Sequence, residues 1–135
     1  MATRSLIGMK KDDTVHYIYC HWDGYPSHHG PILNQYYNDA ETVSQLIKLG
    51  DLSTLDKQIA PPEDSTHSFV DPMKGVCVFY GRDRNEKNVG PKTTTLENYL
   101  QPNYAKNYGV DFKYLFSDNR WWVVNEKDLL ENLEN

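Results

Sequence analysis

The stretch SLIGMKKDDTVHYIYCHW, residues 5–22, decides the fold that the sequence predicts. SLIGMK (5–10) and TVHYIYCHW (14–22) both look like strands, and the second is dense in β-branched and aromatic residues. The polar segment Lys11–Asp13 separates them and is typical of a turn. We therefore expect two joined strands at the start of the chain.

The next segment, DGYPSHHGP (23–31), is expected to be a loop, because it combines glycines and prolines without any periodicity. Helix is expected to begin at Pro31 and to stop at Gly50, as two short consecutive helices or one kinked helix. Asn38 would be the N-cap of the second part. Residues 51–75 are expected to be mostly irregular.

VCVFY (76–80) is predicted to be the central buried strand, because it is a short, continuous apolar run between glycines. Beyond it the expected elements are a polar loop (81–92), a helix opened by a capping box at Thr94 (95–100), a hairpin (111–116 with 120–124) and a final acidic helix or tail (126–135). The sum is an α+β fold: one domain over residues 1–135, with a largely antiparallel sheet of about five strands and short helices packed on it.

Composition fits a soluble folded protein, with 39% hydrophobic and 24% charged residues in a chain of 135. No apolar run approaches the roughly 18–20 residues of a membrane helix, and the N-terminus lacks the pattern of a signal peptide. Cys20 and Cys77 are too few for a disulfide scaffold and are expected to be reduced and buried. These observations predict a cytoplasmic protein that does not associate with a membrane.

The charge balance argues against broad nucleic-acid binding, which needs many cationic contacts to phosphate. The chain has 14 Lys and Arg against 19 Asp and Glu, a net charge of −5. It is rich in aromatic residues, with ten Tyr, three Trp and four Phe. Tyrosine suits contact surfaces because it combines a rigid apolar ring with a polar tip. The alternative is that most of these rings fill the core and edges of a small sheet.

No motif of nucleophilic, phosphate-binding or dinucleotide chemistry is present in the sequence. If the second strand continues, His21 and Asp23 share a face and could hold a metal together with His28 or His29, although the spacing matches no known metal motif. The alternative is that His21 bonds Asp23 or the backbone and that the other two histidines are solvated. We expect no metal, no cofactor and no catalytic residue.

The segment GRDR, residues 81–84, is the best candidate for a binding site, because it follows a predicted strand. Two arginines one residue apart can project to one side and fork onto a phosphate or carboxylate, with the intervening aspartate orienting a guanidinium. Alternatively they pair with acidic groups such as Asp12, Asp13 or Glu86. We expect this loop and the YCHWDGYP loop to form one working surface, with contact residues Arg4, His21, Trp22, Asp23, Tyr25, Arg82, Asp83 and Arg84.

The blocks MATRSLIG, IYCHWDGYPSHHGPIL, LIKLGDLSTL, FYGRDRNEKN and YLFSDNRWWVV together resemble a family of small proteins encoded by bacteriophages. The resemblance spans about residues 1 to 124 and is carried by the order and spacing of the blocks. The chain departs from the pattern at Asn85, where glycine is expected, and in its acidic tail after Val124. The resemblance supplies no catalytic residues; it implies a phage accessory protein acting in the host cytoplasm.

Three functions fit that setting. The first is a non-enzymatic binder that inhibits a host defence or metabolic protein by occupying it. The second is a sponge for a small nucleotide immune signal, in which Arg82 and Arg84 grip phosphate while Trp22 and Tyr25 stack on the base; such a protein would form a homo-oligomer. The third is a small metal-dependent hydrolase or nuclease that uses His21 and Asp23.

Overall fold

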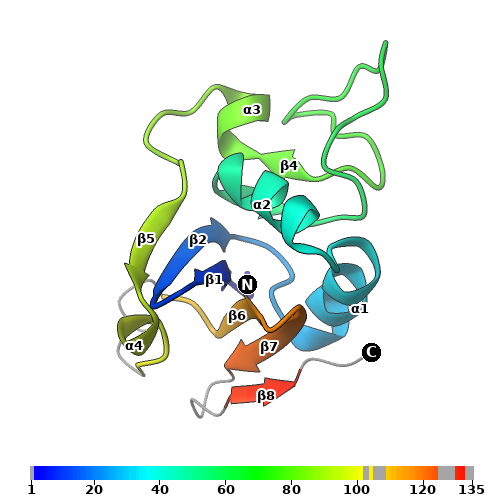
Figure 1. The fold of residues 1–135 in the computed structure, drawn as a ribbon. Coiled ribbons are helices and arrows are strands. Elements are labelled where there is room, and N and C mark those ends of the chain that lie inside the picture. The colour runs from blue at the N-terminus through cyan, green and yellow to red at the C-terminus, as the bar shows by residue number, and fades with distance from the viewer. Residues whose placement is uncertain (1, 102–103, 105–108, 125–129, 133–135) are drawn as a thin grey trace.

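The computed structural model describes residues 2–101, 104, 109–124 and 130–132, which form one mixed sheet with helices on both faces (Figure 1). The strand order is β4-β3-β2-β1-β6-β7-β8, and β5 pairs with β2 on the same side as β3. The elements are β1 (Ser5–Lys11), β2 (Thr14–Cys20), α1 (Pro26–Tyr36), α2 (Ala40–Lys48), β3 (Leu52–Thr54), β4 (Val78–Phe79), α3 (Tyr80–Arg84), β5 (Lys92–Thr95), α4 (Leu96–Tyr99), β6 (Phe112–Ser117), β7 (Arg120–Val124) and β8 (Leu130–Asn132).

Both predicted strand pairs at the two ends of the chain are confirmed. β1 and β2 are antiparallel, and β6 and β7 form the second hairpin. Their turns contain Asp12, Asp118 and Asn119 at positive φ, which Asp and Asn tolerate better than most residues. The predicted α+β class is therefore confirmed.

The sheet is mixed, and it has more strands than the five that we expected. β1 pairs in parallel with β6, and β2 pairs in parallel with β3. Parallel pairs join segments that are distant along the chain, so turn signals in the sequence do not reveal them. β3 lies in the segment that the sequence predicts to be irregular, and β5 runs from the end of the predicted polar loop to the start of the predicted helix.

The segment 76–80 is not the central strand. Only Val78 and Phe79 form β4, which lies at one end of the sheet, while β1 occupies the centre between β2 and β6. The strand stops early because the chain turns into α3, where a polar loop was expected. Oδ2 of Asp83 accepts a hydrogen bond from the backbone N–H of Phe79 at 2.8 Å, which satisfies one of the free donors at the start of that helix.

Helix α1 begins at Pro26, within the segment expected to be a loop, so Pro31 lies inside the helix rather than at its start. Pro26 occupies the first turn, where the missing N–H of proline costs nothing. His29, Gly30 and Leu33 of this helix are buried. Burial against the sheet therefore stabilises a helix that its local sequence disfavours.

Two predicted helix caps are displaced by one residue. Asp39, not Asn38, caps α2 by accepting the N–H of Thr42 at 2.8 Å, and Thr95, not Thr94, caps α4. The predicted stop at Gly50 is confirmed. Its φ is 90°, and a Cβ there would lie 2.2 Å from the carbonyl oxygen of Val89.

The prediction of a C-terminal helix within 126–135 is wrong for residues 130–132, the part of that range that the structure describes. Residues 130–132 form β8, which pairs antiparallel with β7. The remainder of that range lies outside the described residues.

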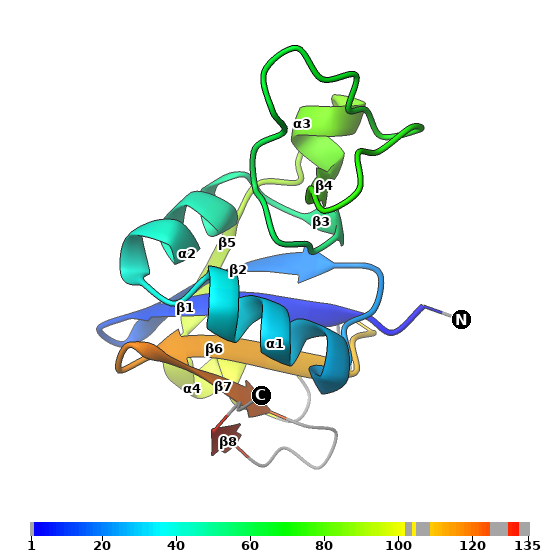
Figure 2. The same cartoon turned by 90° about the vertical axis from the view of Figure 1, so that its right-hand side faces the viewer.

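Helices cover the two faces of the sheet unequally (Figure 2). α1 and α2 cover one face, and the buried residues between them and the sheet include Trp121, whose indole N–H donates to the carbonyl of Tyr37 at 2.7 Å. The short α4 covers the other face, where Tyr99 packs against Tyr17. The aromatic residues of both clusters are part of the core. This agrees with the alternative that many of the aromatic rings fill the core of the sheet.

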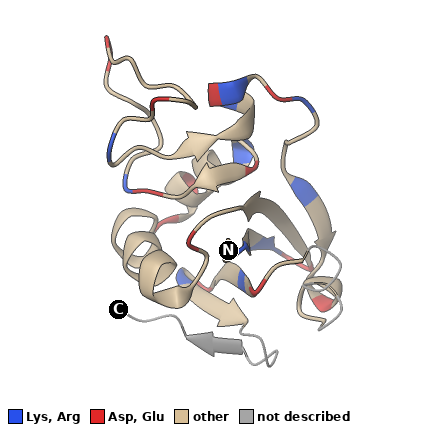
Figure 3. Cartoon of the chain, turned by 180° about the vertical axis from the view of Figure 1, so that it is seen from behind, with Lys and Arg blue, Asp and Glu red and all other residues tan. Residues whose placement is uncertain are grey.

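Both cysteines are buried and unpaired, as predicted. Burial raises the pKa of the Cys20 thiol to about 12, so it stays protonated at neutral pH. Acidic and basic residues are interspersed along the ribbon (Figure 3). Among the described residues, no helix is long and apolar enough to cross a membrane.

Candidate functional site: an anchored loop

The chain between β3 and β4 projects beyond the sheet (Figures 1 and 2). We call residues 56–77 the anchored loop. Backbone hydrogen bonds join its two ends: the N–H of Gln58 donates to Gly75 at 3.0 Å, and the N–H of Cys77 donates to Gln58 at 2.8 Å. The loop therefore closes on itself at its base.

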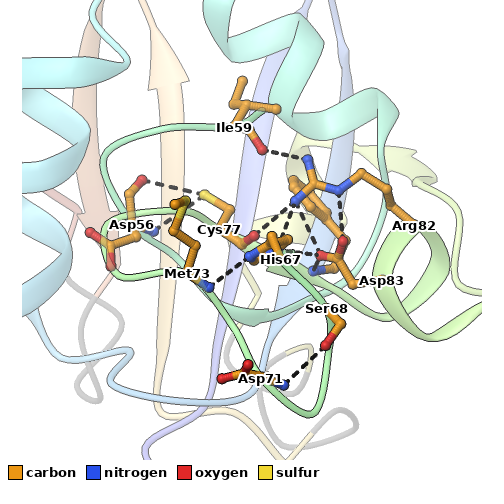
Figure 4. Close-up of polar contacts among 10 residues, drawn as sticks. Asp56, Ile59, His67, Ser68, Asp71, Met73, Cys77, Arg82 and Asp83 are labelled. Carbon is orange, nitrogen blue, oxygen red and sulfur yellow. Dashed lines mark hydrogen bonds and ion pairs between the residues drawn. The ribbon is translucent and has the colours of Figure 1, made fainter. Parts of the chain in front are cut away.

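Arg82 of α3 ties the two limbs of the anchored loop together (Figure 4). Its Nη1 donates to the carbonyl of Ile59 in the first limb, and its Nη2 donates to the carbonyl of Cys77 in the second limb at 2.9 Å. Its Nε donates to Oδ1 of Asp83 at 3.0 Å. The guanidinium also lies over the ring of Phe79, 4.8 Å from its centroid. Arg82 is thus fully engaged within the fold.

His67 connects the middle of the loop to the same helix. The N–H of Met73 donates to Nδ1 of His67 at 2.9 Å, so the imidazole proton is on Nε2 when the ring is neutral. That nitrogen lies 3.3 Å from Oδ2 of Asp83. The His67 side chain is 1% exposed. A buried histidine therefore links the second limb of the loop to α3.

Asp83 is the acceptor on which these contacts converge. Burial would raise the pKa of its carboxyl, but hydrogen bonds from Arg82 and from the Phe79 N–H outweigh burial and lower it. The carboxylate therefore stays ionised, and its charge offsets that of the guanidinium.

The tip of the loop presents apolar side chains. Ser68 and Asp71 exchange hydrogen bonds at 3.1 and 3.3 Å, so Phe69 and Val70 occupy the middle of a tight turn. Phe69 packs on Tyr80, 5.6 Å between ring centroids. Val70 is 91% exposed and Met73 is 40% exposed. The anchored loop therefore holds an apolar tip in solvent on a braced base.

Arg84 turns away from Arg82. Its Nε lies 3.5 Å from Oε2 of Glu86, and its guanidinium lies over the rings of Phe69 and Tyr80. The two arginines therefore contact different groups, and Arg82 uses its donors within the fold. The alternative was that the arginines pair with acidic groups within the fold. Arg82 pairs with Asp83 in this way, and Arg84 pairs with Glu86, one of the suggested partners. The arginine also lines a shallow pocket of about 360 Å³ with Tyr19, Asp51, Tyr80, Glu86 and Val89.

Among the described residues, the imidazole ring of His21 forms a hydrogen bond with Tyr19 and not with Asp23 or the backbone, contrary to the expectation. Its Nδ1 lies 2.8 Å from the hydroxyl of Tyr19, and its ring meets Trp22 edge-on at 4.7 Å. Burial, and then the charge of Arg4, lowers the pKa of His21. Arg4 and His21, two of the expected contact residues, therefore lie near each other.

The remaining expected contact residues lie at the start of α1. Asp23 has a φ of 57°, so the extended strand ends before it and Asp23 does not share a strand face with His21. The hydroxyl of Tyr25 donates to Asp23 at 3.3 Å. Trp22 and Tyr25 are 44% and 39% exposed. β3 lies between this segment and the strand that leads into α3: the N–H of Trp22 donates to the carbonyl of Ser53 in β3, and β4 pairs with β3 on its other edge.

A buried chain of polar groups connects α1 to β1. Oγ of Ser5 lies 3.1 Å from Nε2 of His29, and the two Nδ1 atoms of His28 and His29 lie 2.9 Å apart. The expectation that both histidines are solvated is wrong for His29, which is fully buried. Ser5 is also fully buried, so a substrate has no access to its hydroxyl and the arrangement is structural.

His29 should make the protein sensitive to mild acid. Burial lowers its pKa to about 3, from 6.5 in an unfolded chain. Its contribution to stability is therefore fully present above pH 6.5 and is lost as the pH falls toward 3. We expect about 2 kcal/mol less stability at pH 5 than at pH 7 from this group. Urea unfolding at both pH values measures the loss. A His29→Gln variant has no imidazole at this position. If it lost as much stability between pH 7 and pH 5 as the wild type, His29 would not be the source of the acid sensitivity.

His67 and Val70 were missed by the sequence reasoning, because they lie in a stretch without periodicity and no local pattern links either of them to GRDR. Within the described residues, no three His, Cys, Asp or Glu side chains gather in a group that could hold a metal ion.

Comparison with family models, with curated proteins and with solved structures gave no match.

Proposed function

We propose that this protein is a phage accessory protein that acts in the host cytoplasm as a non-enzymatic binder and inhibits a host protein by occupying its surface through the anchored loop. The observation that carries the proposal is the exposure of Val70 at the tip of a loop whose base is braced by Arg82, Asp83 and His67. The phage setting rests on the resemblance of the sequence blocks.

Bracing favours binding because the loop loses little conformational entropy when a partner engages it. Ordering a mobile side chain at an interface costs about 0.5–1.5 kcal/mol, and preorganisation avoids part of that cost. Here the ordering is already provided by the hydrogen bonds to Ile59, Cys77 and Met73. An exposed valine on such a support can enter a pocket of the partner as an anchor.

The nucleotide sponge has less support from the site. Arg82 already donates its hydrogen bonds to carbonyls of the anchored loop. Arg84 lines a pocket together with the acidic residues Asp51 and Glu86. These acidic groups would repel a phosphate at the same place. Burial raises the pKa of Asp51, but its carboxyl still accepts the N–H of Tyr19 at 2.9 Å. The hydrolase has less support still, because His21 and Asp23 do not share a face.

Capture from host lysate tests the proposal. Tagged wild-type protein is expected to retain a host protein that Val70→Asp retains at least tenfold less, because a hot-spot side chain contributes about 2 kcal/mol or more and the substitution would also place a carboxylate in the pocket of the partner. Val70 is exposed, so the substitution should change the stability by no more than about 0.5 kcal/mol. Quantitative mass spectrometry of the eluted proteins and small molecules measures the difference.

Leu49→Asp is the matched control, because Leu49 is also an exposed apolar residue but lies at the end of α2. It should retain the same host protein as the wild type. Equal capture by Val70→Asp and wild type, or the absence of any specifically retained protein, would refute the proposal. A nucleotide in the wild-type eluate without a host protein would favour the sponge.

A further inference from the structure

A second cavity lies at the far end of the β1–β2 hairpin, beneath α2. Its volume is about 200 Å³, and Met9, Lys11, His16, Ser44, Ile47, Lys48 and Pro91 line it. We call it the hairpin pocket. It shares no lining residue with the anchored loop or with the pocket beside Arg84. It is therefore a site separate from the surface of the proposed function.

The floor of the hairpin pocket is apolar. Ile47 is 4% exposed and belongs to the main core, and Met9 is partly buried against the same core. Pro91, just before β5, adds an apolar wall. A ligand in this pocket would gain by burying an apolar group on these residues.

The polar side chains of the hairpin pocket are basic or neutral. Lys11 ends β1 and Lys48 ends α2, so the fold brings two exposed lysine side chains from distant segments to line one cavity. Within the described part of the chain neither lysine has an ion-pair partner, and none of the lining residues is acidic. The Oγ of Ser44 adds a hydroxyl. Asp12 and Asp13 follow Lys11 in the hairpin turn but do not line the pocket.

His16 adds an oriented imidazole to the same wall. Its Nδ1 lies 3.3 Å from Oγ1 of Thr93 on β5, the strand that pairs with β2 at this point. Its Nε2 has no hydrogen-bond partner among the described residues. The pocket thus combines two cations, a hydroxyl and an imidazole nitrogen above an apolar floor.

We propose that the hairpin pocket binds a small organic anion, a phosphate monoester or a carboxylate that carries one compact apolar group such as a single ring. The lysines and Ser44 would hold the anionic group through charge-assisted hydrogen bonds. Ile47 and Met9 would contact the apolar group. The cavity is smaller than the roughly 300–1,000 Å³ of sites for drug-sized ligands, which limits the ligand to one ring.

Calorimetric titration with matched probes tests the ligand class. Phenyl phosphate and benzoate are expected to bind at least tenfold more tightly than either control. Inorganic phosphate lacks the ring, and phenol lacks the anionic group. The ranking of phenyl phosphate against benzoate identifies which anionic group the pocket prefers. Equal binding of inorganic phosphate and phenyl phosphate, or no binding of any probe, would overturn the proposal.

A pair of neighbouring substitutions on α2 tests the location. Ser44→Glu places a carboxylate at the pocket and is expected to weaken phenyl phosphate at least tenfold. Gln45→Glu makes the same change of charge one residue further, at an exposed position that does not line the pocket, and should bind nearly as the wild type does. Equal effects of both substitutions would mean that only net charge matters and would refute the site.

A second pair lies on β1. Adjacent residues of a strand point to opposite faces, and Lys10 lines a different pocket with Leu96 and Trp122. Lys11→Gln should weaken phenyl phosphate roughly tenfold, whereas Lys10→Gln should leave its affinity within twofold. The Ile47 methyl resonances should shift on titration of the wild type. A shift of the Leu115 methyls instead would place the ligand on the opposite face and would overturn the assignment.

Discussion

Replacement of Trp121 by alanine is expected to lower the free energy of unfolding by about 3–5 kcal/mol, the usual cost of removing a large aromatic side chain from a core. Trp121 is 1% exposed and is the largest of the fully buried side chains. It packs on Phe116 with 5.2 Å between ring centroids, and its indole N–H donates to the carbonyl of Tyr37. The substitution therefore leaves a cavity and a buried carbonyl without its donor. Urea unfolding at pH 7 measures the change.

Trp122 provides a matched control one residue further along β7. It points to the opposite face, is only partly buried, and donates its indole N–H to Ser117 at 3.1 Å. Trp122→Ala should cost clearly less than Trp121→Ala, because less apolar surface leaves a buried environment. Equal losses for the two variants would contradict the assignment of the main core to the face covered by α1 and α2.

Local signals in the sequence were sufficient for the two hairpins. In each hairpin, apolar strands flank a turn of Asp, Asn or Lys, and the partners are close along the chain. The same logic failed for 76–80, where the apolar run is real but only Val78 and Phe79 enter the sheet. A run of buried residues indicates burial and does not specify how many of them form ladder hydrogen bonds, which depends on partners such as β3 from elsewhere in the chain.

Helix α1 shows how burial can override local propensity. The segment PSHHGP contains the residues that terminate helices, and yet it forms the first turns of α1. His29 bonds Ser5, and Leu33 is buried in the main core, so contacts with the sheet compensate for the poor local sequence. Such contacts join residues 24 or more positions apart, and no window of the sequence contains both partners.

The sequence draws attention to GRDR but not to the anchored loop that packs against it. GRDR was singled out as a binding loop, and it forms α3 beside the projecting loop. Arg82 donates to two carbonyls of the anchored loop, and Asp83 contacts the imidazole of His67 and accepts the N–H of Phe79. Val70, the exposed residue that we propose as the contact, lies in a segment where the sequence predicts only irregular chain. An irregular loop is recognised as rigid only after its side-chain contacts are known.

The two arginines of GRDR make different contacts. Arg82 holds the base of the loop, whereas Arg84 lies on its surface beside Glu86, with a side chain that is 52% exposed. Reversing the charge of both arginines at once would mix these roles. Separate substitutions resolve them, because only one of the two side chains donates to the loop backbone.

Arg82→Met is expected to open the anchored loop and to speed its cleavage by chymotrypsin after Phe69 roughly 100-fold. Methionine fills similar space but donates no hydrogen bond, so the carbonyls of Ile59 and Cys77 and the Asp83 carboxylate lose their charged partner. Hydrogen bonds to charged groups are each worth about 1.5–3 kcal/mol, and a loss of about 3 kcal/mol raises the open population roughly 100-fold. Mass spectrometry of timed digests identifies the cut and its rate.

Arg84→Met is the matched control, since Arg84 sits two residues away and makes an exposed pair with Glu86 at 3.5 Å. Exposed pairs contribute about 0–1 kcal/mol, and methionine retains apolar contact with Phe69, so cleavage should accelerate less than fivefold. Thermal unfolding should remain cooperative in both variants, because the core beneath α1 and α2 is untouched. Similar cleavage rates for the two variants would show that the loop is held by other contacts, and the braced loop would then no longer support the proposed binding role.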